Sequence, residues 1–265
     1  MVGVFDSGLG GLTVVREIQD LVPTVSLHYI GDSLHAPYGS RSEAQIQRLS
    51  LGQAEYLRAL GCTALVIACN TATAAAAGAL RASFPHIPII GMEPAVKPAV
   101  AATRSGIVGV LATVGTLQSA RFAALLDRFA TEITVLTRSC PGWVEAVEEG
   151  ALDTPGTLAL LRREIEPLLA AGADTLVLGC THFPALRSQI QALVGPDVTL
   201  IDTGAAVARR VAELVPLSEG EAGALTLYTS GNPTVFLQSA YAILKAEWLP
   251  RVQPLHWKDG KLENA

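Results

Sequence analysis

The 265-residue sequence is poor in charge and holds no run of Lys and Arg. Charged residues make up 16% of the chain and the formal net charge is −5, so a nucleic acid or an anionic membrane surface has no electrostatic match. No stretch has the length and apolar character of a membrane-spanning helix. Half of the residues are hydrophobic, which is typical of a compact folded chain. No basic and then apolar targeting segment precedes the first expected strand at Val2, so we expect a cytoplasmic protein.

Cysteine is also scarce, with only Cys62, Cys69, Cys140 and Cys180. They are too few and too far apart for a disulfide scaffold in a chain of this size. No C-x-x-C pair is present to build a structural zinc site. We therefore expect free thiols and no metal.

One stretch of the sequence occurs twice, at an offset of 111 residues. Residues 65–71 read LVIACNT and residues 176–182 read LVLGCTH, and a glycine stands eight residues before each cysteine. Residues 2–5 and 108–111 also correspond, at an offset of 106. The sequence thus predicts two similar halves, each with a cysteine at the carboxyl end of a central strand.

Strand-like and helix-like segments alternate at the spacing of right-handed βαβ units. The fold class predicted is α/β, with two pseudo-symmetric doubly wound domains, mainly parallel sheets and an active site in the cleft between them. The strand expected at 224–229 and the helix at 232–246 fall outside the repeat, and we expect them to extend the first sheet. The first domain should then comprise residues 1–97 and 208–265, and the second residues 98–207.

Local signals mark some of the helix starts. A helix is expected from Leu12 to Leu21. Ser40 and Glu43 have the spacing of a capping box, which predicts a second helix that runs to about Leu60.

Ligands of open parallel sheets bind beyond the carboxyl ends of the strands. Four polar loops fall there: 6–8, 37–40, 69–71 and 180–182. If the two halves face each other, one thiol approaches a shared cleft from each side. Inverting a stereocentre by proton transfer requires a base on one face of the carbon and an acid on the other, and two thiols can exchange these roles.

A free thiol has a pKa of about 8.5, so one of the two must be helped to ionise. Helix N-termini after both cysteines supply partial positive charge, and Asp6 and His182 are the neighbouring proton acceptors. The N–H groups of Asn70, Thr71 and Thr181 would suit a substrate carboxylate. The two half-reactions are therefore expected to depend on different auxiliary groups.

Structural explanations compete with these functional ones. A single strand-end cysteine is usually a packing residue, and the duplication is what favours function for Cys69 and Cys180. Cys62 lacks such surroundings and is expected in the core, whereas Cys140 precedes a proline in a loop. Asp6 could be a simple helix cap, and the glutamates at 145, 148 and 149 a solvated helix face.

The segment GLGG at 8–11 follows the first strand and suggests an anion-binding turn. It fails the dinucleotide fingerprint, which needs glycine where Thr13 stands, and it lacks the Lys-Ser/Thr pair of a P-loop. We therefore expect no nucleotide cofactor.

Taken together, DSGLGGLT at 6–13, PYG at 37–39, ACNTA at 68–72, LGCTHFP at 178–184 and YTSGNP at 228–233 resemble the bacterial glutamate racemases. The resemblance covers nearly the whole chain in order. It implies racemisation of glutamate without a cofactor, D-glutamate supply for peptidoglycan, and a homodimer. Met92 and Glu93 depart from the more aliphatic pair usual in the family. The N-terminal extension of some activator-dependent members is not seen.

The resemblance also implies roles for individual residues. Cys69 would be the base for one enantiomer and Cys180 for the other, with Asp6 and His182 in support. Asp32 and Glu148 match further acidic positions. Positions that match substrate contacts are Asp6, Ser7, Pro37, Tyr38, Gly39, Ser40, Asn70, Thr71, Thr113, Thr116, Thr181 and His182.

Four other functions compete with glutamate racemisation. A sister enzyme could act on aspartate or a hydantoin, although His182 and Phe183 stand where the aspartate branch has an acidic residue. A cysteine hydrolase would need only one thiol. A pyridoxal-phosphate racemase would need a Schiff-base lysine, and Lys97 is the only lysine in the first 244 residues. An amino-acid-binding protein would show no turnover.

Overall fold

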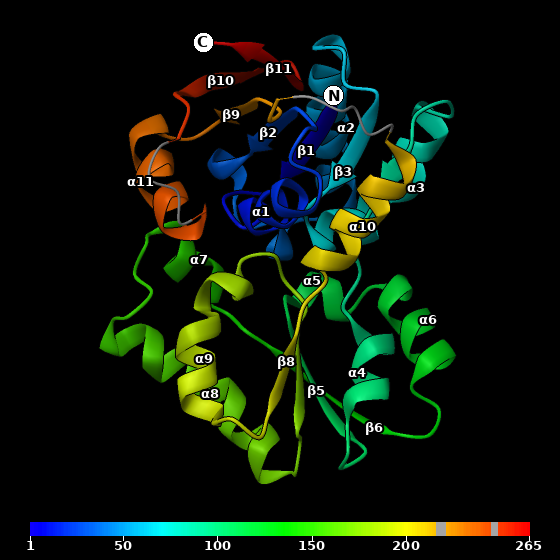
Figure 1. Cartoon of the computed structure of the whole chain (residues 1–265), viewed down its shortest axis with the longest axis vertical. Coiled ribbons are helices and arrows are strands. Elements are labelled where there is room, and N and C mark those ends of the chain that lie inside the picture. Colours follow the sequence, from blue (N-terminus) through cyan, green and yellow to red (C-terminus); the bar gives the residue numbers. More distant parts are fainter. Residues whose placement is uncertain (216–220, 245–248) are drawn as a thin grey trace.

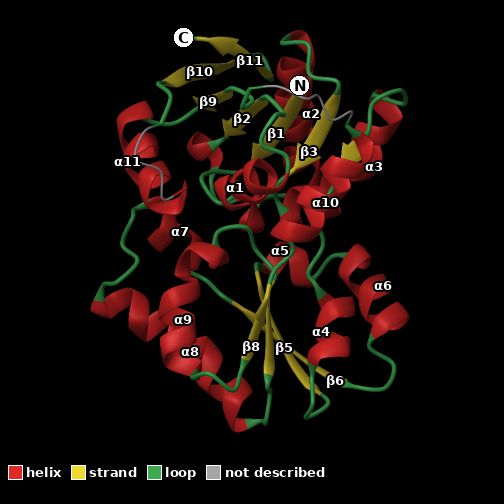
Figure 2. Cartoon of the chain, viewed as in Figure 1, coloured by secondary structure: helices red, strands yellow, loops and turns green. Residues whose placement is uncertain are grey.

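The computed structural model describes residues 1–215, 221–244 and 249–265, and within these residues the strands form two sheets (Figures 1 and 2). The first sheet has the order β11-β10-β9-β2-β1-β3-β4. Its strands are β1 (Val2–Asp6), β2 (Leu27–Gly31), β3 (Ala64–Ile67), β4 (Ile89–Ile90), β9 (Leu225–Thr229), β10 (Val252–Lys258) and β11 (Lys261–Asn264). The second sheet has the order β6-β5-β7-β8, from β5 (Ile107–Ala112), β6 (Thr134–Ser139), β7 (Thr175–Leu178) and β8 (Thr199–Ile201). All neighbouring strands run parallel except β10 and β11, which confirms the predicted fold class.

Helices cover both sheets, as Figure 1 shows. Around the first sheet lie α1 (Leu12–Leu21), α2 (Glu43–Ala59), α3 (Asn70–Ser83), α10 (Gly204–Leu214) and α11 (Pro233–Leu244). Around the second lie α4 (Val96–Ala102), α5 (Val114–Leu117), α6 (Ala120–Phe129), α7 (Trp143–Glu148), α8 (Pro155–Ala170) and α9 (Arg187–Val194). Short 3-10 turns stand at η1 (Ser33–His35), η2 (Tyr38–Ser40) and η3 (Phe183–Leu186). None of the helices in the described ranges has the length and apolar character that crossing a membrane requires.

The internal repeat is present in the packing as well as in the strand order. Gly3 in β1 pairs with Leu65 in β3, and Gly109 in β5 pairs with Leu176 in β7. A Cβ at Gly3 would lie 2.9 Å from Leu65 and 3.0 Å from Leu57 of α2, while one at Gly109 would lie 2.6 Å from Leu176 and 2.8 Å from Leu168 of α8. The same glycine-to-leucine contact therefore seats the equivalent helix on each sheet.

The segment beyond the repeat returns to the first sheet, as expected. β9 pairs with β2 in parallel, and α11 packs against β9 and β10. The last two residues of the helix expected at 232–246 lie outside the described residues. The hairpin of β10 and β11 was not predicted, because Pro254 lacks an N–H and the segment carries many polar residues. The domain limits at residues 97 and 208 stay a prediction.

The expected capping box at Ser40 and Glu43 is wrong. Ser40 ends the turn η2, and the backbone is extended at Arg41 and Ser42. The Ser42 hydroxyl accepts a hydrogen bond from the backbone N–H of Gln45 at 3.4 Å, and the Gln45 side chain bonds back to Ser42. The capping box that starts α2 therefore lies two residues later than expected, at Ser42 and Gln45.

We predict opposite effects on stability for two glycine substitutions. Gly109→Ala should lower the free energy of unfolding by about 1–3 kcal/mol, because the new methyl group must displace two packed leucines. Gly78→Ala should raise it by about 0.5–1 kcal/mol, because Gly78 lies inside α3 with nothing within 4 Å of the new methyl group. Urea unfolding of both variants measures the difference. A Gly109→Ala variant as stable as the parent would contradict the proposed contact.

Candidate active site

Asp6 ends β1 and has no exposed surface. Its carboxylate accepts hydrogen bonds from the N–H of Ser7 at 2.7 Å and of Gly11 at 2.6 Å. A third comes from the Thr181 hydroxyl at 3.3 Å, on the other half of the molecule. Burial raises the pKa of Asp6, against the lowering effect of the charge on His182 and of the two N–H groups. The carboxyl group is thus held in place by both halves.

Cys69 lies between β3 and α3, where its sulfur is the N-cap of the helix and accepts from the N–H of Ala72 at 3.4 Å. Its Sγ lies 3.8 Å from the Ser7 Oγ, which lies 3.3 Å from the Asp6 Oδ1. Burial raises the pKa of Cys69 well above its ordinary value, and the negative charge of Asp6 raises it further. Ser7 therefore connects the first cysteine to a buried carboxyl group.

Cys180 follows β7 and has different partners. Its Sγ lies 3.8 Å from the Nδ1 of His182, and the Nε2 of His182 lies 2.6 Å from the Oε1 of Glu148. Burial acts to lower the pKa of His182, but the hydrogen bonds and charges of Cys180 and Glu148 outweigh it and raise that pKa well above the ordinary value. The imidazole of His182 therefore lies between Cys180 and Glu148, and its Nε2 also lies 3.3 Å from the backbone N of Gly10. The second cysteine thus faces a histidine that pairs with a glutamate, whereas the first faces a serine and an acid.

Glu148 reaches from α7 into the loop that follows β1. Its Oε1 accepts from the N–H of Leu9 at 2.6 Å, and its Oε2 lies 3.4 Å from the Ser33 hydroxyl. The other two glutamates considered for a solvated face, Glu145 and Glu149, are exposed. Glu148 is not, because its carboxylate is used to join the two halves.

The loop after β7 meets α1 and the loop after β1 of the first half. The Thr13 hydroxyl donates to the backbone oxygen of Thr181 at 3.1 Å. Cys69 and Cys180 are 6% and 8% exposed, and the proximity of Cys180 adds to the raised pKa of Cys69. Each half therefore contributes one buried thiol to the region where the halves meet.

A cluster of hydroxyl groups lies beside Cys69. The Thr71 Oγ1 is 2.8 Å from that of Thr113 and 3.2 Å from that of Thr116. The neighbouring Asn70 is 4% exposed, and neither polar atom of its side chain has a hydrogen-bond partner among the described residues. A buried amide with open bonds is a group that a ligand or an ordered water completes.

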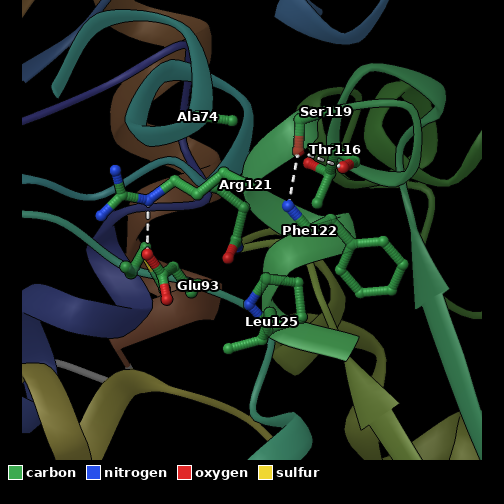
Figure 3. Close-up of a pocket in the computed structure, with 10 residues that line it drawn as sticks. Ala74, Glu93, Thr116, Ser119, Arg121, Phe122 and Leu125 are labelled. Carbon is green, nitrogen blue, oxygen red and sulfur yellow. Dashed lines mark hydrogen bonds and ion pairs between the residues drawn. The ribbon is translucent and has the colours of Figure 1, made fainter. Parts of the chain in front are cut away.

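Asn70 also lines a cavity of about 10 Å³ between α3, α6 and residues 92–94 (Figure 3). Arg121 reaches across this cavity to form an ion pair with Glu93. The volume suits a single water molecule and is too small for an amino acid.

The remaining expected contacts lie around η2. Tyr38 is 1% exposed and points its hydroxyl at Asp32, while Ser40 is exposed. The turn packs against α5 of the other half, which begins after Thr113. Asp32 is fully buried and receives its hydrogen bonds within the first half.

Two further cysteines lie outside this arrangement. Cys62 is fully buried in the apolar core between the first sheet and α2, which confirms the expectation for it. Cys140 is also buried, and burial raises its pKa. Four residues whose side chains contact the carboxylate of Glu148 or Asp32 were missed: Ser33, His35, Ser230 and Trp257. Ser230 belongs to the YTSGNP motif, whereas nothing near Trp257 in the sequence marks it.

Comparison with known proteins decides the family. The sequence model of one family, described as Asp/Glu/hydantoin racemase, matches residues 3–211. The chain belongs to this racemase family.

Individual relatives of this racemase-family chain are similar over almost their whole length. The glutamate racemase of Ectopseudomonas mendocina is 55% identical over 249 residues, which cover 93% of this chain and 95% of the relative. A solved glutamate racemase from Bacillus anthracis has a TM-score of 0.87 at 34% identity and 98% coverage of both chains. That of Francisella tularensis, solved in complex with D-glutamate, has a TM-score of 0.82 at 27% identity and 96% coverage of both chains.

The raised pKa of His182 predicts a pH-dependent loss of stability in Glu148→Gln. A histidine whose pKa is higher in the folded chain than in the unfolded chain stabilises the fold when it is protonated. This stability is fully present below the pKa of the unfolded chain, about 6.5, and is lost as the pH rises through the pKa of the folded chain. Without the Glu148 charge the shift is smaller, so the variant should be less stable by about 1–3 kcal/mol between about pH 5 and 6.5, with a deficit that narrows at higher pH. Urea unfolding between pH 5 and 9 measures it.

Glu149→Gln is the matched control, because Glu149 is exposed at the end of the same helix. It should leave stability unchanged at every pH. A deficit in Glu148→Gln that is constant with pH, or that Glu149→Gln reproduces, would show that His182 does not owe its raised pKa to Glu148.

Proposed function

We propose that this chain interconverts L- and D-glutamate by means of two thiols, without a cofactor. The observation that supports the proposal is a pair of buried cysteines, Cys69 and Cys180, each of which follows an equivalent strand of a different half. A relative that is 55% identical to this chain is named a glutamate racemase, and the Escherichia coli and Francisella tularensis structures are described as complexes with L- and D-glutamate.

The proposed reaction begins with one cysteine as thiolate and the other as thiol. The thiolate takes the α-proton from one face of glutamate, and the electron pair stays on the α-carbon beside the carboxylate. The second thiol then gives its proton to the opposite face. Each turnover exchanges the protonation states of Cys69 and Cys180, so the reverse reaction uses the same groups in opposite roles.

The neighbours of each sulfur support a different step. His182 lies between Cys180 and Glu148, so it is placed to exchange a proton with the Cys180 sulfur while Glu148 holds the imidazole in position. Asp6 acts on Cys69 through Ser7, and its raised pKa brings its proton affinity closer to that of a thiol.

The substrate needs electrostatic support, because a hydrogen next to a carboxylate is a very weak acid. We propose that the backbone N–H groups of Asn70 and Thr71 at the N-terminus of α3, together with the threonines at 71, 113, 116 and 181, bind the substrate carboxylates. The loop 37–40 contributes further contacts to the substrate. Asp6, Ser7 and His182 are the remaining residues that we propose contact it.

The wider proposal follows the resemblance. D-Glutamate made by this chain would serve peptidoglycan synthesis in the cytoplasm, and the working form would be a homodimer. Residues 1–97 with 208–265 and residues 98–207 would be its two domains.

We predict that Cys69→Ser and Cys180→Ser each lose racemisation in both directions, by about 10²–10⁴-fold, because either face of the carbon then lacks its acid or base. Circular dichroism of pure L- and of pure D-glutamate, with no pyridoxal phosphate added, follows the reaction. Cys62→Ala removes a buried thiol outside the site and Lys97→Ala the lysine that a pyridoxal mechanism would need, and both should keep activity. Full turnover by Cys180→Ser in both directions would contradict the two-thiol mechanism, and faster turnover of aspartate would favour the sister enzyme.

Asp6→Asn and His182→Asn should each lower kcat by about 10²-fold, but through different half-reactions. The two enantiomers are equally stable, so kcat/KM has to remain equal in both directions, and the difference must be sought in isotope effects. With α-deuterated substrates, Asp6→Asn should enlarge the isotope effect for the enantiomer that Cys69 deprotonates and reduce it for the other. His182→Asn should do the reverse. Equal isotope effects for both enantiomers in both variants would contradict the assigned partners.

A further inference from the structure

The carboxylate of Asp32 is fully buried and collects hydrogen bonds from separate segments of the first half. The Tyr38 hydroxyl donates to Oδ2 at 2.7 Å. The Ser230 hydroxyl and the indole Nε1 of Trp257 donate to Oδ1 at 2.6 Å and 2.7 Å. The Nδ1 of His35 lies 3.1 Å from both oxygens. Because both oxygens are already occupied, Asp32 is arranged to hold its neighbours in place.

Trp257 brings the C-terminal hairpin into this cluster. It stands in β10, opposite Leu262 of β11, and its ring lies on α2 at Gly52. A Cβ at Gly52 would lie 2.6 Å from the ring, so only glycine leaves room for the indole there. The His35 ring meets the indole edge-on, with ring centroids 5.6 Å apart. The hairpin and α2 therefore fix the direction of the indole N–H.

Tyr38 carries the cluster on to the substrate loop. It belongs to η2, the turn of the loop 37–40, and its hydroxyl also accepts from the Nε2 of Gln53 at 3.0 Å. The same turn packs against α5 of the other half. Asp32 thus lies between a hairpin at one edge of the first sheet and a loop that faces the cleft.

We propose that Trp257 is a positioning residue: through Asp32 and Tyr38, its indole N–H holds the loop 37–40 where the loop contacts the substrate. The inference rests on the proposed function, in which this loop binds glutamate. A buried carboxylate needs all of its donors. When one donor is lost, the Asp32 oxygen to which it donated lacks a partner. The remaining donors or water then move toward this oxygen, and the loop 37–40, which Tyr38 anchors, moves with them.

Three substitutions test this role. Trp257→Phe keeps an aromatic ring on α2 but removes the N–H, and Ser230→Ala removes the other donor to the same oxygen. Tyr56→Phe is the matched control, because the Tyr56 hydroxyl joins α2 to Asn264 of the same hairpin without touching Asp32. Trp257→Phe and Ser230→Ala should each raise KM for both enantiomers by about five- to tenfold with kcat within about twofold of the parent, since binding and not chemistry is weakened. Tyr56→Phe should change neither value.

Hydrogen exchange of the amides at 38–41 gives a readout that is independent of activity. Exchange should be faster in Trp257→Phe and Ser230→Ala than in the parent chain and in Tyr56→Phe. The double variant should raise KM by less than the product of the two single effects, because both act on one carboxylate.

The proposal is overturned if both variants keep the parent KM and exchange rates, if kcat falls while KM stays the same, or if Tyr56→Phe gives the same result as Trp257→Phe. If Trp257→Phe does not fold, Ser230→Ala decides by the same criteria. If the parent chain does not racemise glutamate, the proposed function fails, and the exchange rates of the loop still decide whether Trp257 positions it.

Discussion

The carboxylate of Glu148 lies where the two halves of the molecule meet, and it makes hydrogen bonds with both. On one side it accepts from the N–H of Leu9 in the loop after β1, and on the other it holds the ring of His182. The side chain of Glu148 is only 17% exposed, and its carboxylate bonds to partners from both halves. The contact between the two halves and the raised pKa of His182 therefore depend on the same few bonds, so a change at Glu148 disturbs both.

The repeated fold places two thiols at equivalent positions, yet it does not make them equivalent. Gly3 and Gly109 seat equivalent helices on the two sheets, and each central strand is followed by a cysteine. The second half, however, carries α7 after β6, and there His182, which bonds to Glu148, lies beside Cys180. In the first half, Cys69 meets the N–H of Ala72 and the Ser7 hydroxyl, and Ser7 connects it to Asp6. A symmetric scaffold thus gives its two thiols chemically different neighbours.

The first half differs from the second by the strands β9, β10 and β11, which extend its sheet beyond β2. This extension places Ser230 and Trp257 against Asp32, and so connects the C-terminus of the chain to a loop near its N-terminus. The addition covers the edge of β2 and at the same time supplies donors to a buried charge. A segment that looks like a structural appendage in the sequence therefore bonds to Asp32, which in turn holds Tyr38 of the loop 37–40.

Much of this protein was determined by patterns that lie close together in the sequence. The helix from Leu12 to Leu21, the repeated strands and the cysteine at the end of each follow from apolar periodicity and from the repeat, since both are local or recur at a constant offset. Only the tertiary structure decided which partner each polar group meets. Glu148 bonds to Leu9, which is 139 residues away in the sequence, and Asp32 bonds to Trp257, which is 225 residues away. Neither pair shares a local sequence pattern. A buried charge takes whichever donors the fold brings to it, and the fold brings them together only when two sheets and a terminal hairpin have packed.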